Sequence, residues 1–414
     1  MTAKQTLSDA DWQSKTYEII ELFSPGAPID ENDLFAGRQH EISQIIEAAL
    51  QRGQHAIVYG ERGVGKTSLA KTFSLRLIRP TKTLSSVIVN CDPQDTFTSL
   101  WRKVYKDLGE EGGGNVLDGT TINDISPDDV RRVLTRFDLT TTPIIILDEF
   151  DKLQDPNAKA LIANTIKSLS DYSVAATIVL VGVAKSVNDL LRDHASIGRA
   201  LIQIPMPRMK AAELAEIIDK RLPRVGMTIT PAAKAQIVAL SAGLPHYTHL
   251  LGQHAGRRAI ESRSLTIDVQ HVDDAERDCL ERAHHSIREQ YHRATQSPRS
   301  GNIYKEVLLA CALAEPDELG FFPAKAIEVP LSIIMQKQYK VAMFGQHLKI
   351  LCEADRAKML EVTGSPRRFR YRFEEPLMQP YVILRGLADG LITKNTLRQL
   401  MPNYLQPRLS GGEV

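Results

Sequence analysis

The sequence has few cysteines, and none has the spacing that a zinc site needs. Its 414 residues include four, namely Cys91, Cys279, Cys311 and Cys352, which lie far apart and form no C-x-x-C pair. Structural zinc sites commonly take their ligands from such pairs. The sequence therefore excludes the common zinc spacings, and isolated thiols favour a reducing compartment such as the cytosol.

Long apolar runs are also missing. The most apolar stretches, residues 143–147 and 175–184, are much shorter than the ~20 residues of a membrane span. The first 15 residues mix charges without an apolar centre, unlike a signal peptide. We therefore expect a cytoplasmic protein. The 51 Lys and Arg balance 50 Asp and Glu, so net charge identifies no partner and any basic surface must be local.

Short apolar segments alternate with amphipathic ones from about residue 34. At roughly 100–200 residues per domain, this length predicts two or three domains. Strand patterns alternating with helix patterns predict a parallel sheet covered by helices. The predicted strands are residues 55–59, 86–90, 144–147 and 177–183, and the predicted helices are residues 38–51, 66–77, 98–108 and 130–137. Residues 110–124 are glycine-rich and predict a loop.

A glycine-rich motif follows the first predicted strand. It matches G-x-x-x-x-G-K-[ST] in full, with Ser68 next in the chain, and comprises Gly60, Glu61, Arg62, Gly63, Val64, Gly65, Lys66 and Thr67. In such a loop the backbone N–H groups point at phosphate oxygens, and the helix that follows adds its positive end. We expect Lys66 to reach the β- and γ-phosphates of ATP and the Thr67 hydroxyl to ligate Mg²⁺.

Two carboxylates follow the third predicted strand. Asp148 and Glu149 come directly after the apolar residues 144–147, at the strand end where open α/β sheets bind ligands. We expect Asp148 to hold Mg²⁺ through water and Glu149 to polarise the attacking water, because phosphoryl transfer needs a positioned nucleophile. The alternative is a solvated acidic pair.

These motifs resemble those of AAA+ ATPases, above all the branch of the origin-recognition initiators. The resemblance covers residues 34–258, and residues 34–38, 60–67, 147–153 and 196–199 carry it. It implies that Phe35, Gly37 and Arg38 lie beside the adenine. It also implies that Arg199 reaches the γ-phosphate bound by a neighbouring subunit, and hence an ATP-dependent homo-oligomer. The alternative for Arg199 is an ordinary surface arginine.

Two positions depart from this family pattern. Ala184 and Lys185 stand where the family has a small polar sensor, so Lys185 is the candidate there, with Ser186 and Asn188 as alternatives. His246 stands where the initiators have an arginine that opens a lid helix. The preceding Gly243-Leu244-Pro245 resembles the Gly-x-Pro element of STAND-type ATPases. Because histidine is a weaker phosphate ligand than arginine, we expect slow hydrolysis. A packed lid histidine is the alternative for His246.

The last part of the chain has a winged-helix pattern. Helices are predicted at residues 302–314, 332–338 and 343–353, and strands at 358–363 and 368–373. Alternation in the second strand should expose Arg368, Arg370 and Arg372 and bury Phe369, Tyr371 and Phe373. With Arg367 in the turn and Lys358 nearby, this face is a candidate for DNA phosphates. A merely solvated outer face is the alternative.

The sequence therefore predicts an α/β P-loop NTPase with an AAA+ core, a helical lid and a C-terminal winged helix. The expected parts are an N-terminal arm at 1–33, the core at 34–209, the lid at 210–295, a linker at 296–301, the winged helix at 302–388 and a tail at 389–414. ATP state would control assembly and the binding of double-stranded DNA. In the alternatives, a STAND-like switch holds ATP and recruits an effector protein, or a transposition or phage-defence regulator recruits a nuclease or transposase.

Overall fold

The structure, a computed structural model, describes residues 7–26, 34–76, 86–112, 124–137, 142–183, 197–297, 301–366 and 368–401. The chain forms two compact units. One, called here the core unit, comprises Pro28–Glu61 and Gly65–Pro207. The other, called the lid unit, comprises Met1–Ala27, Arg62–Val64 and Arg208–Val414.

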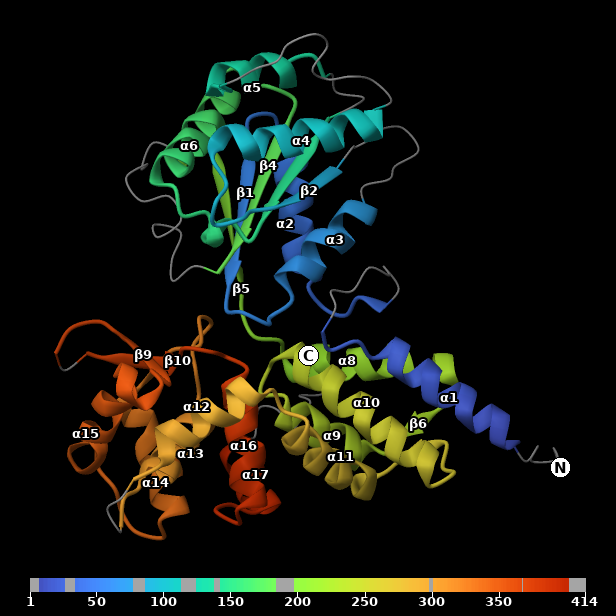
Figure 1. Cartoon of the computed structure of the whole chain (residues 1–414), viewed down its shortest axis with the longest axis vertical. Helices are drawn as coiled ribbons and strands as arrows, with labels where there is room; N and C mark the ends of the chain where they lie inside the picture. The colour runs from blue at the N-terminus through green and yellow to red at the C-terminus, as the bar shows by residue number, and fades with distance from the viewer. Residues whose placement is uncertain are drawn as a thin grey trace, which may run out of the picture. The chain divides into compact units, whose positions relative to one another are not determined.

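A parallel five-stranded sheet forms the centre of the core unit (Figure 1). Its strands are, in sheet order, β2 (Ser86–Asn90), β3 (Ile144–Asp148), β4 (Thr177–Gly182), β1 (His55–Gly60) and β5 (Leu201–Met206). The four predicted strands are confirmed. The sequence did not predict β5, because Gln203 and Pro205 interrupt its apolar pattern. Proline is tolerated there since β5 lies at the edge of the sheet.

Helices pack against this sheet and bury its apolar side chains. They are α2 (Gln39–Leu50), α3 (Lys66–Arg76), α4 (Phe97–Gly112), α5 (Pro127–Leu134) and α6 (Pro156–Asp171). Trp101 and Tyr105 of α4 lie with Ile145 and Leu147 of β3 in one buried cluster. The structure extends the helix predicted at residues 98–108 to Phe97–Gly112 and adds α6; residues 113–123 of the predicted loop lie outside the described residues.

The lid unit contains a helix where we predicted an arm. Helix α1 (Asp9–Leu22) begins with a capping box, in which Ser8 and Asp11 exchange hydrogen bonds. Only Ile19 of α1 is buried, so the segment lacks an apolar stripe that would reveal a helix. It packs on α10 (Pro245–Glu261), where Gly252 and Gly256 leave room for Phe23 and Ile19.

The helical part predicted for the lid is confirmed, with a small addition. Its helices are α8 (Ala211–Arg221), α9 (Pro231–Leu240), α10, α11 (Val269–Glu281) and α12 (His285–Thr295). Two short strands, β6 (Thr228–Ile229) and β7 (Thr266–Ile267), pair in parallel between the helices. Among the described residues, no helix is both long and apolar enough to cross a membrane.

The remaining elements have the order expected of a winged helix. They are α13 (Tyr304–Leu313), β8 (Phe322–Pro323), α14 (Glu328–Ile334), α15 (Val341–Leu351), β9 (Leu360–Thr363) and β10 (Arg370–Phe373), followed by α16 (Met378–Ala388) and α17 (Lys394–Leu400). The three strands form an antiparallel sheet in the order β8-β10-β9. One apolar cluster runs from Ile19 of α1 through the lid helices to Leu397 of α17, so these parts share a core.

Alanine at Gly252 or Gly256 should loosen α1. An added Cβ would come within 2.6 Å of the Phe23 ring at Gly252 and within 2.7 Å of Ile19 at Gly256. We expect each substitution to destabilise the lid unit by about 1–3 kcal/mol, the usual cost of overpacking. Unfolding followed by the fluorescence of Trp12, which packs against the same core, measures this.

The control for this prediction is Gly345→Ala in α15. A Cβ there meets nothing within 4 Å, and alanine favours a helix over glycine by up to about 1 kcal/mol. We expect this variant to be as stable as the parent or more stable. Equal effects of all three substitutions would contradict the proposed packing of α1.

Candidate functional site

The glycine-rich loop connects the end of β1 to the start of α3. Gly60 ends β1 beside the backbone of Met206 in β5, which leaves no room for a Cβ. Gly63 and Gly65 have φ values of 83° and 97°, in the region that favours glycine. The structure thus has the tight turn that the motif predicted, with α3 starting at Lys66. Arg62, Gly63 and Val64 are grouped with the lid unit.

The Lys66 amine is held by the loop itself. Its Nζ donates hydrogen bonds to the carbonyl oxygens of Gly60, at 3.2 Å, and Glu61, at 2.7 Å. The side chain therefore curls back over the loop instead of extending into solvent. Phosphate oxygens are stronger partners for an ammonium group than neutral carbonyls, so this position allows Lys66 to move to a bound phosphate.

Asp148 ends β3 almost completely buried, with an exposed fraction of 2%. Its Oδ1 accepts the backbone N–H of Glu149 at 2.8 Å, whereas its Oδ2 is buried without a hydrogen bond to any described residue. Burial raises the pKa of this carboxyl; the nearby Thr67 hydroxyl, the N–H of Glu149 and the charge of Lys66 only partly oppose the rise.

A hydrated Mg²⁺ fits this chemistry. The unsatisfied Asp148 oxygen and the adjacent Thr67 hydroxyl are oxygen ligands, which Mg²⁺ prefers directly or through its retained waters. The cation would also compensate the buried negative charge. The buried Asp148 oxygen thus supports the predicted metal position, although the described residues contain no cluster of three or more metal-ligating side chains.

Glu149 has an unusual backbone conformation. Its φ of 55° and ψ of 35° are left-handed, which is costly for a residue other than glycine and often marks a functional turn. Its side chain is 44% exposed, and Oε2 pairs with the Nζ of Lys152 at 2.7 Å. The carboxylate is thus accessible to water beside Asp148, but a lysine holds it in this structure.

The residues predicted to lie near the adenine are in the core unit. Phe35 and Arg38 are buried, and Gly37 and Arg38 both have positive φ values. Arg38 Nη1 pairs with Glu41 at 3.0 Å, and Nη2 donates to the carbonyl of Pro207. This guanidinium therefore fixes the entry to α2, and a contact of these residues with adenine stays a prediction.

His246 is packed and hydrogen-bonded within the lid unit. Its Nδ1 is 2.7 Å from the carbonyl oxygen of Pro25, and its ring packs edge-on against Tyr247. Burial lowers the pKa of His246, so the imidazole is neutral at pH 7. The ring holds the segment after α1 on the lid, which is the packing role we gave as its alternative. A neutral ring is a poor substitute for a phosphate-binding arginine.

Two further candidates have little support from contacts. Arg199 is exposed in the turn before β5, and its carbonyl accepts a hydrogen bond from Gln54 at 3.2 Å. No ion pair joins its side chain to a residue that the structure describes, so its contact with a neighbouring subunit stays a prediction. Lys185 lies outside the described residues, as do Ser186 and Asn188, and so does Arg367 in the turn of the wing.

Asp151 was not among the site residues predicted from the sequence. Its Oδ1 accepts the backbone N–H of Val183 at 2.5 Å, and a Cβ at Gly182 would collide with the same oxygen. Asp151 thereby ties the end of β4 to the turn that carries Glu149. The only signal in the sequence was a third carboxylate three residues after Asp148.

The wing differs from the predicted alternation. Arg372 is buried, pairs with Glu361 at 2.8 Å and stacks over the ring of Phe321, whereas Phe369 is 40% exposed. Strand β8 pairs with the other edge of β10, and Phe321, just before β8, packs against Arg372 on the face where the arginines were expected to be free. Arg368 and Arg370 are exposed, but Arg370 pairs with Asp317 and Lys358 with Glu374.

Comparison with known proteins agrees with the motifs. Residues 49–191 match the family described as AAA domain. Over these residues the chain is similar to AAA domains. The chain is also 30% identical to the ORC1-type DNA replication protein 2 of Thermoplasma acidophilum over 207 residues, which are 48% of this chain and 50% of that protein. The predicted likeness to the origin-recognition branch is therefore confirmed. The chain spans about half the length of the curated relatives it matches.

Solved structures agree in fold over most of the chain. A Walker-type ATPase of Pyrococcus abyssi superposes with a TM-score of 0.52 at 17% identity, covering 87% of this chain and 99% of that one. The ORC2 protein of Aeropyrum pernix, solved in ADPNP–ADP complexes, gives a TM-score of 0.50 at 14% identity, covering 92% and 98%. At these identities the likeness shows the fold alone.

The buried Asp148 carboxylate should destabilise the nucleotide-free protein. Because its pKa is raised, ionisation at pH 7 favours the unfolded state, and that cost disappears when the pH falls far enough to protonate the group. We expect Asp148→Asn to stabilise the nucleotide-free core by about 1 kcal/mol, within the range for an unsatisfied buried group. A thermal melt at pH 7 measures this as a rise of a few degrees.

Asp171→Asn is the matched control, since Asp171 is an exposed carboxylate at the end of α6. It should leave the melting temperature unchanged. If Asp148→Asn lowers the melting temperature of the nucleotide-free protein, Asp148 is a stabilising structural carboxylate, and the argument for a cation-binding site at Oδ2 fails.

Proposed function

We propose that this protein is a cytoplasmic ATPase of the AAA+ type, which binds ATP with Mg²⁺ at the glycine-rich loop and hydrolyses it slowly. The observation that carries the proposal is the buried Asp148 oxygen that lacks a partner beside Thr67 and Lys66. A carboxylate in this state needs a cation. The adjacent loop has the backbone and the lysine that bind the phosphates accompanying such a cation.

Each residue of the site has a distinct role in this proposal. The P-loop amides and Lys66 bind the phosphates, while Thr67 and Asp148 hold the Mg²⁺, whose charge offsets the charge that develops on the phosphoryl oxygens. Glu149 orients the attacking water and accepts its proton. Arg199 of a second copy adds positive charge at the γ-phosphate. The site is then complete only in an ATP-dependent oligomer.

Two contacts support slow turnover. The ion pair between Glu149 and Lys152 must open before Glu149 can act on a water, and exposed pairs of this kind are worth about 0–1 kcal/mol. In the lid, the neutral His246, which is hydrogen-bonded to the carbonyl of Pro25, stands in place of a positively charged arginine that would contact the phosphate. Slow hydrolysis would therefore determine how long the ATP-bound state lasts before the protein returns to the ADP-bound state.

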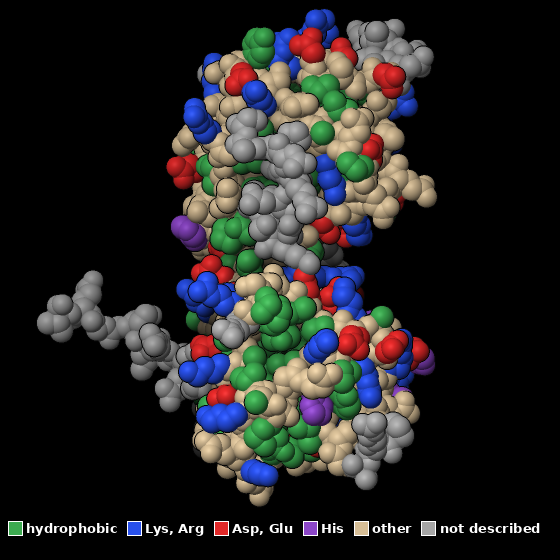
Figure 2. Space-filling view, turned by 90° about the vertical axis from the view of Figure 1, so that its left-hand side faces the viewer, with side chains coloured by type: hydrophobic (Ala, Val, Ile, Leu, Met, Phe, Trp, Pro, Cys, Tyr) green, Lys and Arg blue, Asp and Glu red, His purple; other side chains and the backbone are tan. Residues whose placement is uncertain are grey.

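We propose that the winged helix binds double-stranded DNA. The second helix of such a motif enters the major groove, and the outward face of α15 presents Met343, Gln346 and Lys349. Arg368 of the wing is exposed as well and has no ion pair with a described residue. On the side of the lid unit turned toward the viewer, Figure 2 shows apolar side chains together with basic and acidic ones. The relatives to which the chain is similar are DNA replication proteins, which supports this proposal.

An ATP-holding regulator of the STAND type is the second candidate. The Gly243-Leu244-Pro245 turn and the neutral His246 favour it, because both depart from an initiator lid. Such a protein would use its winged helix to hold an effector protein or to regulate the core. It would bind ATP as tightly as the first candidate but would not bind DNA.

The ATP site is tested by two substitutions with different effects. Lys66→Ala should abolish the stabilisation by Mg-ATP, which reaches about 2.7 kcal/mol at 100 times the dissociation constant. Glu149→Gln should keep this stabilisation but release no phosphate, since an amide cannot accept the proton of water. Thermal melts and phosphate release measure the two effects. An equal Mg-ATP shift in the wild type and in Lys66→Ala would refute the site.

The DNA surface is tested by its salt dependence. Lys349→Ala and Arg368→Ala should each lower the slope of log affinity against log salt by about one unit, and together by about two, because each contact releases counterions. Arg132→Ala is the control, since Arg132 is 69% exposed on α5 of the core unit. A salt slope unchanged in the double variant, together with altered basal ATPase activity, would favour the STAND-type regulator.

A further inference from the structure

Arg208 joins the lid to the winged helix through a buried hydrogen-bond node. It is the first residue of the lid unit after the core, and only 9% of it is exposed. Its Nη1 donates to the carbonyl oxygen of Ala242, at 3.2 Å, and to Oε1 of Gln379, at 2.5 Å. Ala242 precedes the lid helix α10, and Gln379 lies in α16, so one guanidinium spans both parts.

The Gln379 amide can take only one orientation in this node. It is 4% exposed, and its Nε2 donates to the carbonyl oxygen of Ala312 at 2.6 Å while its Oε1 accepts from Arg208. The flipped amide would place a donor against the guanidinium and an acceptor against a carbonyl. The node therefore connects Arg208 through Gln379 to α13, the central helix of the winged helix.

The lid turn that Arg208 contacts is itself constrained. Ala242 and Gly243 have φ values of 48° and 81°, both left-handed, and alanine reaches such a conformation only at a cost. The N–H of Met209 donates to the carbonyl of Gly243 at 2.9 Å. Arg208 and Met209, the first two residues after the core unit, thus hold this turn, Arg208 by its side chain and Met209 by its backbone.

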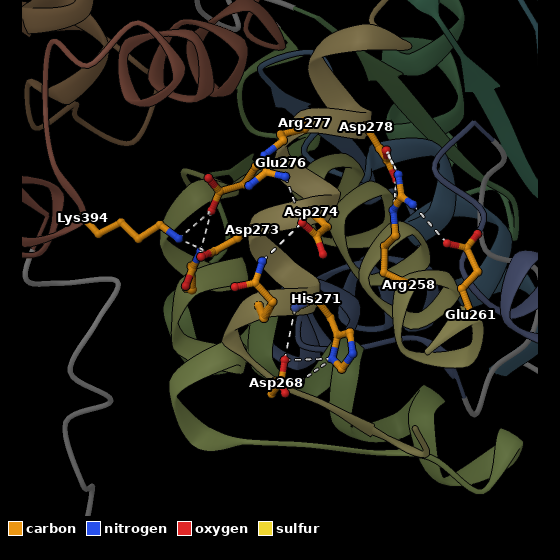
Figure 3. A network of polar contacts seen from close by, with 12 residues as sticks. Arg258, Glu261, Asp268, His271, Asp273, Asp274, Glu276, Arg277, Asp278 and Lys394 are labelled. Atoms are coloured by element: carbon orange, nitrogen blue, oxygen red, sulfur yellow. Dashed lines mark hydrogen bonds and ion pairs between the residues drawn. The ribbon is translucent and has the colours of Figure 1, made fainter. Parts of the chain in front are cut away.

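A second set of contacts joins the same parts at a distance from Arg208. Lys394 at the start of α17 pairs with Asp273 and Glu276 of α11, and Gln236 of α9 donates to both carboxylates. Figure 3 shows Lys394 extending from α17 toward these two carboxylates. The Tyr247 hydroxyl of α10 also donates to the carbonyl of Leu377 at 3.0 Å.

We propose that Arg208 and Gln379 are positioning residues that make the lid and the winged helix turn as one body when the nucleotide state changes. This rests on the proposed ATP-driven switch. Arg208 directly follows the segment that leaves β5. A rotation of the backbone at this point would move Ala242 and Gln379 together, because the Arg208 side chain is hydrogen-bonded to both. The DNA-binding surface would then move with the lid, without a hinge between the two.

Pairs of spin labels test this in the full-length chain. Cys352 is the native cysteine that is not buried, so labels at Gln270→Cys in α11 and Asp355→Cys near β9 are placed in a Cys352→Ser background. We expect a single narrow distance distribution that is identical with Mg-ADP and with a non-hydrolysable ATP analogue. Arg208→Met and Gln379→Leu, which remove the two halves of the node, should broaden the distribution and shift its centre.

Arg277→Met is the control, because Arg277 is 70% exposed on α11 and should leave the distribution narrow. A wild-type distance that changes between the two nucleotides would overturn the single body. A narrow, unshifted distribution in both Arg208→Met and Gln379→Leu, verified as folded by thermal melts, would overturn the node. A second pair, Asp171→Cys with Asp355→Cys, reports motion of the core unit relative to the lid unit. If its distance is also the same with both nucleotides, while the node variants still broaden the distribution of the first pair, the switch is wrong and the node stands.

Discussion

A carboxylate buried at the end of the central strand is the constraint on which the core depends. Strand β3 is buried along its whole length and pairs with β2 and β4, so its backbone cannot move to bring Asp148 to solvent. A fixed carboxylate with an unpaired oxygen is unfavourable without a cation. The P-loop, β1 and the turn at Glu149 are arranged around that position, which explains why a costly group is placed on a strand that is buried along its whole length.

The lid unit depends on a different constraint, a shared apolar core. Helix α1, the lid helices and the winged helix contribute to one cluster, and buried polar nodes such as Arg208 with Gln379 specify how these parts fit together. Apolar packing tolerates several arrangements, whereas a buried guanidinium is favourable only when its acceptors are in place. Specificity of arrangement, more than stability, is therefore what this node adds.

The sequence predicted those parts of the molecule whose chemistry is local. The P-loop and the strand before Asp148 have fixed spacing and a continuous apolar run, and both were found where they were expected. Strand β5 was missed because Gln203 and Pro205 suit an edge, and α1 was missed because it buries little apolar surface. Arg372 and His246 were predicted to bind ligands. Their packing was missed because their partners, Glu361 and Pro25, lie too far along the chain for a local pattern to reveal.

Whether the P-loop and Asp148 bind Mg-ATP is best tested by a crystal structure with Mg²⁺ and a non-hydrolysable ATP analogue. We expect Lys66 Nζ to leave the carbonyl oxygens of Gly60 and Glu61 for the β- and γ-phosphates. We also expect the Mg²⁺ at the Thr67 hydroxyl, with one of its waters at Asp148 Oδ2. A nucleotide bound elsewhere would contradict this binding mode. So would Lys66 that keeps its hydrogen bonds to the carbonyl oxygens of Gly60 and Glu61 while the nucleotide occupies the loop.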